Sequence, residues 1–245
     1  MKVTAVQLAL NESAGGAEKR PLVEMIRMSL ARALHDGVRV LLFPLYEGVL
    51  SPEKISPALA DLQETARLGR MMICISRAAG RTTLIDTDGT VMGEVGVEIE
   101  GRVFKTTLGK VGVTTARGGK FFKVAENLVE SSARLVLHPM NALAGISFEA
   151  LDQMRSEHTS HWKYALVASN FVGVADAGDH FAGCSLVALS NGEVPVKASM
   201  DAPDFVSVEL PSGSMDDEGL LQDRFRLLPK LRRIAEITRF TPPII

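Results

Sequence analysis

The 245-residue sequence has few cysteines, no large excess of either charge and no long apolar run. Its two cysteines, Cys74 and Cys184, are too few and too far apart for a disulfide framework, so we expect reduced thiols and a cytoplasmic protein. Lys and Arg number 27 against 29 acidic residues, giving a net charge of -2, so neither a nucleic-acid nor a membrane partner is predicted. No apolar run approaches the length of a membrane span.

Signals for secretion and for nucleotide binding are also missing. The first ten residues, MKVTAVQLAL, form a short apolar stretch that Gln7 interrupts, so we expect no signal peptide. The polar loop over residues 11–20 lacks the Gly-Lys-Ser/Thr ending of a phosphate-binding loop. No cofactor is therefore predicted. There is also no short-period repeat or low-complexity segment.

The stretch GKVGVTTARGGKFFKVAE, residues 109–126, organises the rest of the chain. Its first seven residues alternate and carry β-branched side chains as a buried strand does. Arg117, Gly118, Gly119 and Lys120 interrupt that pattern, and apolar residues then recur at helical spacing. A sharp strand-to-helix turn of this kind can present a nucleophile, but the residue at that point is Ala116.

Strands and helices alternate along the whole chain. In the first half we expect strands over residues 3–10, 38–43 and 71–76, helices after Pro21 and over 55–70, and a hairpin of 81–86 with 90–95. In the second half we expect strands over 109–115, 134–138, 166–170 and 205–210, and a hairpin of 181–189 with 194–198. We expect helices over 121–131, over 150–161 with a continuation to 164, and over 220–237. The repeated order predicts two sheets, one from each half, packed face to face with helices outside.

Several motifs in this order resemble the nitrilase, or carbon–nitrogen hydrolase, superfamily. The segments that carry the resemblance are VTAVQL at residue 3, DGVRVLLFP at 36, LIDTDG at 84, GKVGV at 109, LVLHP at 135, VASN at 167 with FAGCS at 181, and RLLPKL at 226. The resemblance covers nearly the whole chain. It implies a single domain over residues 1–245, with an α/β fold that is a four-layer α-β-β-α sandwich of two mixed sheets.

The resemblance also implies a cysteine nucleophile, a glutamate base and a lysine, but this sequence does not match those positions. The glutamate is expected directly after Phe43-Pro44, where the chain has Leu45. The cysteine is expected after the strand that begins at Gly109, where the chain has Ala116. No lysine aligns in the short segment after the first hairpin, because Lys105 fits the strand before Gly109 better. Alanine and leucine can neither attack a carbonyl nor take a proton.

Other residues are candidates for a site. Glu47 lies two residues after Leu45 and could act as a displaced base, so we group Leu45, Glu47 and Ala116 as a candidate relic pocket. The alternative for Glu47 is a solvated carboxylate. A role as relocated nucleophile is open to Cys74 and Cys184, although mid-strand cysteines are usually small core residues.

Charged turns and histidines complete the candidates. The turn Arg117, Gly118, Gly119, Lys120 opens a helix and is a candidate anion-binding site, or an ordinary connection with solvated charges. No metal is predicted: the pair His158 and His161 has helical spacing but no evident third ligand. A further polar cluster, Asp176, Asp179 and His180, is typical of a solvated loop.

These observations favour a nitrilase-like protein without the hydrolase triad, acting as a scaffold, a regulatory subunit or a binder of a small-molecule ligand. The alternative is a divergent amidohydrolase that cleaves a non-peptide C–N bond with Glu47 and a cysteine or water. A third hypothesis is a module that binds a carboxylate or phosphate at residues 117–120. Symmetric dimers are the commonest soluble assembly, so we expect a homodimer or association with a related subunit. The resemblance implies that the basic C-terminal helix, with the helices after the turn at residues 117–120, joins the subunits.

Overall fold

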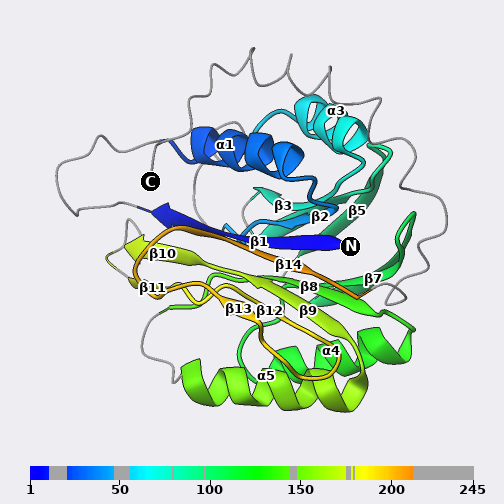
Figure 1. The fold of residues 1–245 in the computed structure, drawn as a ribbon, viewed down its shortest axis with the longest axis vertical. Coiled ribbons are helices and arrows are strands. Elements are labelled where there is room, and N and C mark those ends of the chain that lie inside the picture. Colours follow the sequence, from blue (N-terminus) through cyan, green and yellow to red (C-terminus); the bar gives the residue numbers. More distant parts are fainter. Residues whose placement is uncertain are drawn as a thin grey trace.

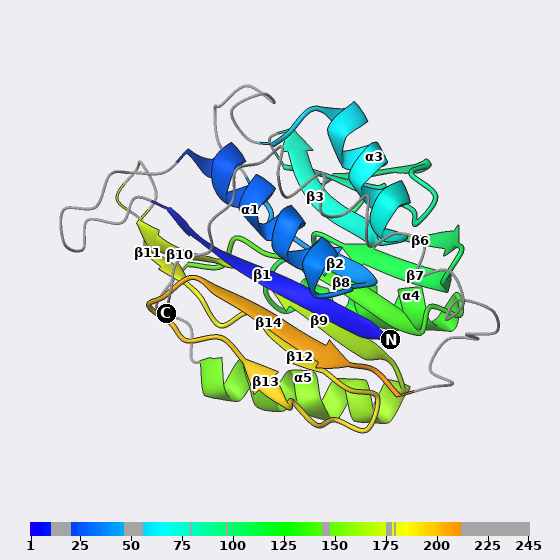
Figure 2. The ribbon, with the colours of Figure 1, turned by 45° about the horizontal axis from the view of Figure 1, so that its top comes forward.

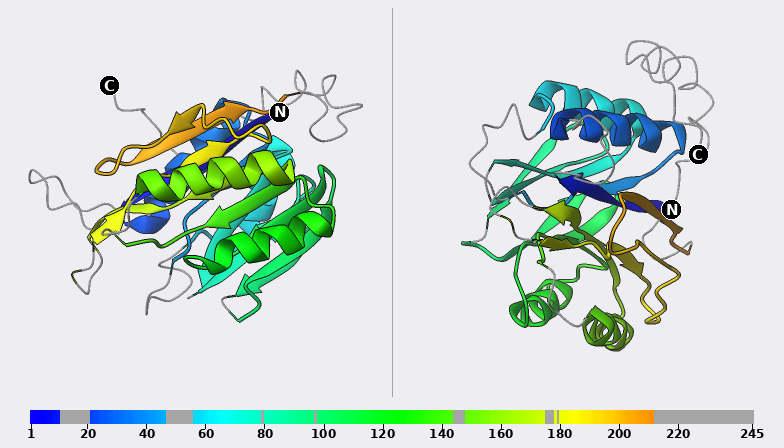
Figure 3. Two further views of the ribbon diagram at one scale, coloured as in Figure 1. Left: turned by 90° about the horizontal axis from the view of Figure 1, so that it is seen from below. Right: turned by 90° about the vertical axis from the view of Figure 1, so that its left-hand side faces the viewer.

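Two β-sheets lie face to face, and helices cover the outer face of each (Figure 1). The computed structural model describes residues 1–10, 21–46, 56–78, 80–96, 98–143, 148–174, 178 and 180–211. The helices are α1 (Leu22–His35), α3 (Leu59–Gly69), α4 (Lys120–Glu130) and α5 (Phe148–Trp162). Figure 3 (right) shows α1 and α3 outside one sheet and α4 and α5 outside the other, which is the predicted four-layer α-β-β-α sandwich.

The first sheet is built around the N-terminal strand. Its order is β11 (His180–Ala182), β10 (Phe171–Val174), β1 (Lys2–Leu10), β2 (Val40–Leu42), β3 (Met72–Ala78), β4 (Arg81–Ile85) and β5 (Val91–Gly96), and β14 (Asp204–Glu209) also pairs with β1. Strands β1, β2 and β3 are parallel, and β3, β4 and β5 are antiparallel. The sheet is therefore mixed, as expected.

The second sheet is built around three parallel strands. Its order is β13 (Val196–Lys197), β12 (Leu186–Ala188), β9 (Ala165–Ser169), β8 (Leu135–Pro139), β7 (Gly109–Thr114) and β6 (Gly101–Thr106). Strands β7, β8 and β9 run parallel, and their neighbours β6 and β12 run antiparallel to them. All five residues of β8 and of β9 are buried, as expected for strands covered on both faces.

The inner faces of the two sheets form the main hydrophobic core. Val3, Leu42, Val113 and Leu137 belong to one cluster, although they come from strands of both sheets. Separate clusters lie under α1 and α3 and under α4 and α5. None of the described helices is long and apolar enough to cross a bilayer.

The expectation that each half of the chain supplies one sheet is wrong. Strands β10, β11 and β14 come from the second half but pair in the first sheet, and Figure 2 shows β14 beside β1. All six residues of β14, from Asp204 to Glu209, pair antiparallel with residues 2–7. Local periodicity predicts that a strand forms, but pairing partners depend on contacts distant in sequence.

The predicted strand over residues 181–189 is divided between the two sheets. Residues up to Ala182 pair with β10, whereas Leu186 and its successors pair with β9 and β13. The chain changes direction at Gly183 and Cys184, which adopt φ values of 62° and 58°. A Cβ at position 183 would lie 2.7 Å from the carbonyl oxygen of Ser199, so only glycine fits there.

Both predicted hairpins are present, and most helix boundaries are close to expectation. Strand β4 pairs with β5 around Gly89, and β12 pairs with β13 around Gly192. Helix α3 begins at Leu59 rather than at residue 55, and α5 extends to Trp162. The segment after the first hairpin contains β6. Lys105 lies in this strand before Gly109, as predicted, and is exposed. The predicted C-terminal helix lies outside the described residues.

Candidate functional site

Leu45 and Ala116 follow strands of different sheets, and the end of β8 connects them. The backbone N–H of Leu45 donates to the carbonyl oxygen of Met140 at 2.9 Å. The imidazole Nε2 of His138 lies 3.0 Å from the carbonyl oxygen of Ala116. His138 and Met140 are two residues apart at the carboxyl end of β8, so the fold brings these two predicted positions to one place. Leu45 and Ala116 are both buried, with exposed fractions of 1% and 2%.

Threonine hydroxyls fix the backbone that precedes Ala116. The hydroxyl of Thr114 accepts from the N–H of Ala116 at 3.1 Å and donates to the carbonyl oxygen of Glu100 at 2.6 Å. The hydroxyl of Thr115 donates to the carbonyl oxygen of Gly96 at 3.2 Å. The residue at the nucleophile position is therefore held rigidly, but its methyl group has no acid–base or nucleophilic chemistry.

The candidate anion-binding turn lies on the surface. Gly118 has a φ of 53°, and neither it nor Gly119 has any atom within 4 Å of an added Cβ. The ammonium of Lys120 pairs with a carboxylate oxygen of Glu100 at 2.8 Å, and this hydrogen bond raises the pKa of Lys120. Arg117 is exposed and has interactions of its own. One of the two cations in the turn is therefore already paired with an anion.

Both cysteines are buried, Cys74 in the main hydrophobic core and Cys184 within the electrostatic reach of Lys197, Asp152 and Arg155. Cys74 is central in β3 with no exposed surface, and burial raises the pKa of its thiol well above its usual range. Cys184 is also fully buried, and burial is the main cause of its raised pKa. Because the thiolate is the reactive form, neither thiol is activated as a nucleophile. Glu47, Asp176 and Asp179 lie outside the described residues.

The predicted histidine pair has other contacts. His158 Nδ1 lies 2.9 Å from the hydroxyl oxygen of Tyr164, and its ring lies against Phe122 on α4. Among the described residues, no group of three or more His, Cys, Asp or Glu side chains could hold a metal ion. His180, from the second polar cluster, begins β11 and is exposed.

Two buried groups at the end of β8 were missed at the sequence level: His138, which contacts Ala116, and Arg155, which contacts Met140. His138 stacks on Phe121 with a centroid distance of 4.3 Å, and burial lowers its pKa to about 3. Arg155 on α5 is 2% exposed, and its positive charge contributes to the lowered pKa of His138. The available signal was helical spacing, because Arg155 lies four residues before the buried Thr159 and therefore on the same face.

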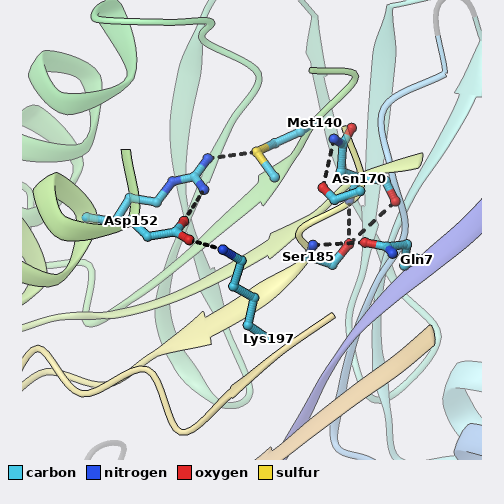
Figure 4. A network of polar contacts seen from close by, with 8 residues as sticks. Gln7, Met140, Asp152, Asn170, Ser185 and Lys197 are labelled. Carbon is cyan, nitrogen blue, oxygen red and sulfur yellow. Dashed lines mark hydrogen bonds and ion pairs between the residues drawn. The ribbon is translucent and has the colours of Figure 1, made fainter. Parts of the chain in front are cut away.

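A second polar group lies close by, where the two sheets meet (Figure 4). The amide of Gln7 accepts from the N–H of Ser185 at 2.9 Å and donates to two carbonyl oxygens, those of Ser199 and Ala202. The amide of Asn170 donates to the carbonyl oxygens of Ala142 and Gly183 and accepts from the N–H of Ala142. In both amides, the nitrogen donates two hydrogen bonds and the oxygen accepts one, so no polar atom of Gln7 or Asn170 lacks a partner.

Comparison with known proteins identifies the fold. No family model matches the chain, and no curated protein matches it in sequence. Among solved structures, the NitN amidase from Nesterenkonia sp. AN1 matches with a TM-score of 0.67 and 20% identity, over 94% of this chain and 98% of that one. A cysteine-to-serine mutant of the Nesterenkonia AN1 amidase from the nitrilase superfamily matches with a TM-score of 0.68 and 20% identity, over 94% and 96%. A mutant of that amidase in complex with butyramide matches with 0.67 and 21%, over 94% and 96%. The chain therefore has the fold of nitrilase-superfamily amidases, as the sequence resemblance implied.

Proposed function

From the fold shared with nitrilase-superfamily amidases, we propose that this protein does not hydrolyse C–N bonds and instead binds a small ligand in the relic pocket of Leu45, Glu47 and Ala116, as a scaffold or regulatory subunit. One observation carries the proposal. The two described positions, which the resemblance assigns to the base and the nucleophile, are buried apolar residues linked through the end of β8. Neither side chain can supply the proton transfer or covalent step of amide hydrolysis.

The two cysteines support the same conclusion. Both thiols are buried, and burial raises the pKa of each. A relocated thiolate would require a cationic or polar neighbourhood that lowers the pKa instead.

The second candidate function is a divergent amidohydrolase in which Glu47 activates water or a cysteine. It is favoured by the names of the solved structures, which are amidases. It requires catalytic groups outside the positions that the resemblance identifies, because fold alone does not determine chemistry.

Three organisational features belong to the proposal. We expect residues 1–245 to form a single nitrilase-like domain in the cytoplasm, since both cysteines are free thiols. We expect the protein to form a homodimer or to associate with a related subunit. An alternative ligand site is the turn of Arg117, Gly118, Gly119 and Lys120, whose exposed backbone opens α4.

The test is ammonia release by pure protein from a panel of amides, nitriles and carbamoyl compounds, with and without thiol alkylation. The Nesterenkonia amidase serves as positive control. We expect no steady turnover. Turnover that alkylation abolishes would overturn the proposal in favour of Cys74 or Cys184, whereas turnover that survives alkylation but is lost in Glu47→Gln would establish the water mechanism.

A further inference from the structure

Arg155 is a buried cation with too few partners. Its side chain is 2% exposed and projects from α5. Nη1 lies 3.3 Å from Asp152 Oδ1, Nη2 lies 2.9 Å from the sulfur of Met140, and Nε is buried without any partner. A thioether is a weak acceptor, so within the described part of the chain this guanidinium makes a single long contact with an anion, Asp152.

Among the described residues, the groups around Arg155 do not supply the missing negative charge. Asp152 also pairs through Oδ2 with Lys197, so one carboxylate serves two cations (Figure 4). Burial keeps the thiol of Cys184 and the phenol of Tyr164 protonated by raising the pKa of each. Burying a charge without compensation is costly, so the site as a whole has an unmet demand for an anion.

The two nitrogens of Arg155 that have no oxygen partner, Nε and Nη2, lie on one edge of the guanidinium, which we call the unused edge. Nε and Nη2 donate in the same direction, and this edge matches the two oxygens of a carboxylate. Nη1, on the other side, is the nitrogen that faces Asp152. The residue in contact with the unused edge is Met140, a flexible side chain that can move aside.

The end of β8 links this edge to Leu45 and Ala116. The carbonyl oxygen of Met140 accepts the hydrogen bond from Leu45, and His138, two residues earlier, contacts the carbonyl oxygen of Ala116. A carbonyl oxygen can only accept, so His138 Nε2 carries the proton and Nδ1 is an acceptor, which is buried without a partner. Arg155 Nε and His138 Nδ1 are therefore both buried without a hydrogen-bond partner, and both residues contact the segment that links Leu45 and Ala116.

We propose that the Nε–Nη2 edge of Arg155 binds the carboxylate of a small organic acid held beside Leu45 and Ala116. The ligand carboxylate forms a bidentate ion pair with the guanidinium, and its apolar part contacts Leu45 and Ala116. The inference rests on the proposed function, because both place the ligand beside Leu45 and Ala116. It specifies the class of ligand, a small apolar carboxylate rather than a neutral amide.

Isothermal titration calorimetry on the full chain tests the site with matched probes. Butyrate and butyramide have the same size and differ in charge. We expect butyrate to bind in the millimolar range or tighter and butyramide to bind at least tenfold more weakly. Straight-chain carboxylates from acetate to hexanoate cover other sizes, and absence of binding by the whole series would overturn the proposal.

Three variants locate the binding. Arg155→Met should weaken butyrate binding at least tenfold, and Arg155→Lys, which keeps the charge but not the bidentate edge, should restore it only in part. Lys120→Ala should leave it unchanged. Equal affinity in wild type and Arg155→Met, or loss confined to Lys120→Ala, would place the anion elsewhere and overturn the proposal.

Two controls separate the possible failures. Circular dichroism and thermal unfolding verify that each variant is folded, and Arg155→Gln provides a polar replacement if Arg155→Met does not fold. Ammonia release is measured on the same samples. Turnover of butyramide would refute the proposed function, whereas its absence together with failure to bind carboxylates would refute only this inference.

Discussion

Figure 4 brings together two polar groups that lie close in space and differ in how well their hydrogen-bonding atoms are satisfied. The group of Gln7, Asn170 and Ser185 is neutral, and every amide nitrogen and oxygen in it has a hydrogen-bond partner. The group of Arg155 and Asp152 is charged, and it includes a buried Nε without a partner. Buried polar atoms are normally satisfied, so the second group is the exception that needs an explanation.

The difference separates a structural role from a functional one. The neutral group joins the two sheets, since Gln7 on β1 binds Ser185 next to β12 of the other sheet. The charged group adds little to stability, because the cost of burying Arg155 offsets its single long ion pair. Sites that bind ligands often retain such unfavourable groups, at a cost in stability.

The largest expected effect comes from breaking the neutral group. Asn170→Ala leaves the N–H and carbonyl oxygen of Ala142 and the carbonyl oxygen of Gly183 without their partner. At about 1 kcal/mol or more for each, the free energy of unfolding should fall by about 3 kcal/mol. Urea unfolding measures the change. Ser207→Ala, which removes one partly buried bond to Thr4, is the control with a smaller expected loss. An Asn170→Ala protein as stable as Ser207→Ala would show that the network does not join the sheets.

The next effect concerns pH. The pKa of His138 is about 3 in the folded protein, below the usual value for histidine, so the unfolded chain binds a proton that the folded protein does not. Stability therefore decreases as the pH falls below about 6.5, with a slope approaching about 1.4 kcal/mol per pH unit. This loss ends only near the folded-state pKa.

His138→Phe should remove that contribution while keeping an aromatic ring against Phe121. Between about pH 7 and about pH 5, the wild type should lose about 2 kcal/mol more than the variant. Urea titrations at each pH give the difference directly, because the carboxylates contribute equally to both proteins. Parallel pH profiles would mean that folding does not lower the pKa of His138.

A smaller effect, of opposite sign, is expected in the charged group. Arg155→Met removes a buried cation, and Asp152 keeps its contact with Lys197. The free energy of unfolding should stay the same or rise by up to about 2 kcal/mol. Thermal and urea unfolding without added ligand measure it. A clear loss of stability would show that Arg155 holds the fold together and would remove the contrast with Asn170.

The smallest effect is expected at the surface turn. Lys120 pairs with Glu100, but the lysine side chain is 73% exposed. Exposed ion pairs contribute little because water and salt screen them. Lys120→Ala should leave the unfolding midpoint unchanged at moderate salt, and a marked shift would indicate that the turn participates in packing.

Much of the fold follows from local patterns in the sequence. The alternation of β-branched strands and amphipathic helices predicts the layers, and the turn signals around Gly89 and Gly192 predict two hairpins. Local patterns did not predict that β10, β11 and β14 belong to the first sheet. These short strands have the same local character as their neighbours. Strands β10 and β14 pair with β1, which lies far away in sequence, and β11 joins the sheet through β10.

The sequence by itself determined which residues stand at the two positions that the resemblance assigns to reactive groups, and the leucine at position 45 and the alanine at position 116 carry no reactive group in any fold. Only the tertiary structure decided that His138 and Arg155 lie beside these positions with unsatisfied nitrogens. The physical reason is that the cost of a buried charge depends on which partners surround it. For Arg155, those partners are residues of α5 and the end of β8, which are brought together only when the helix packs on the sheet.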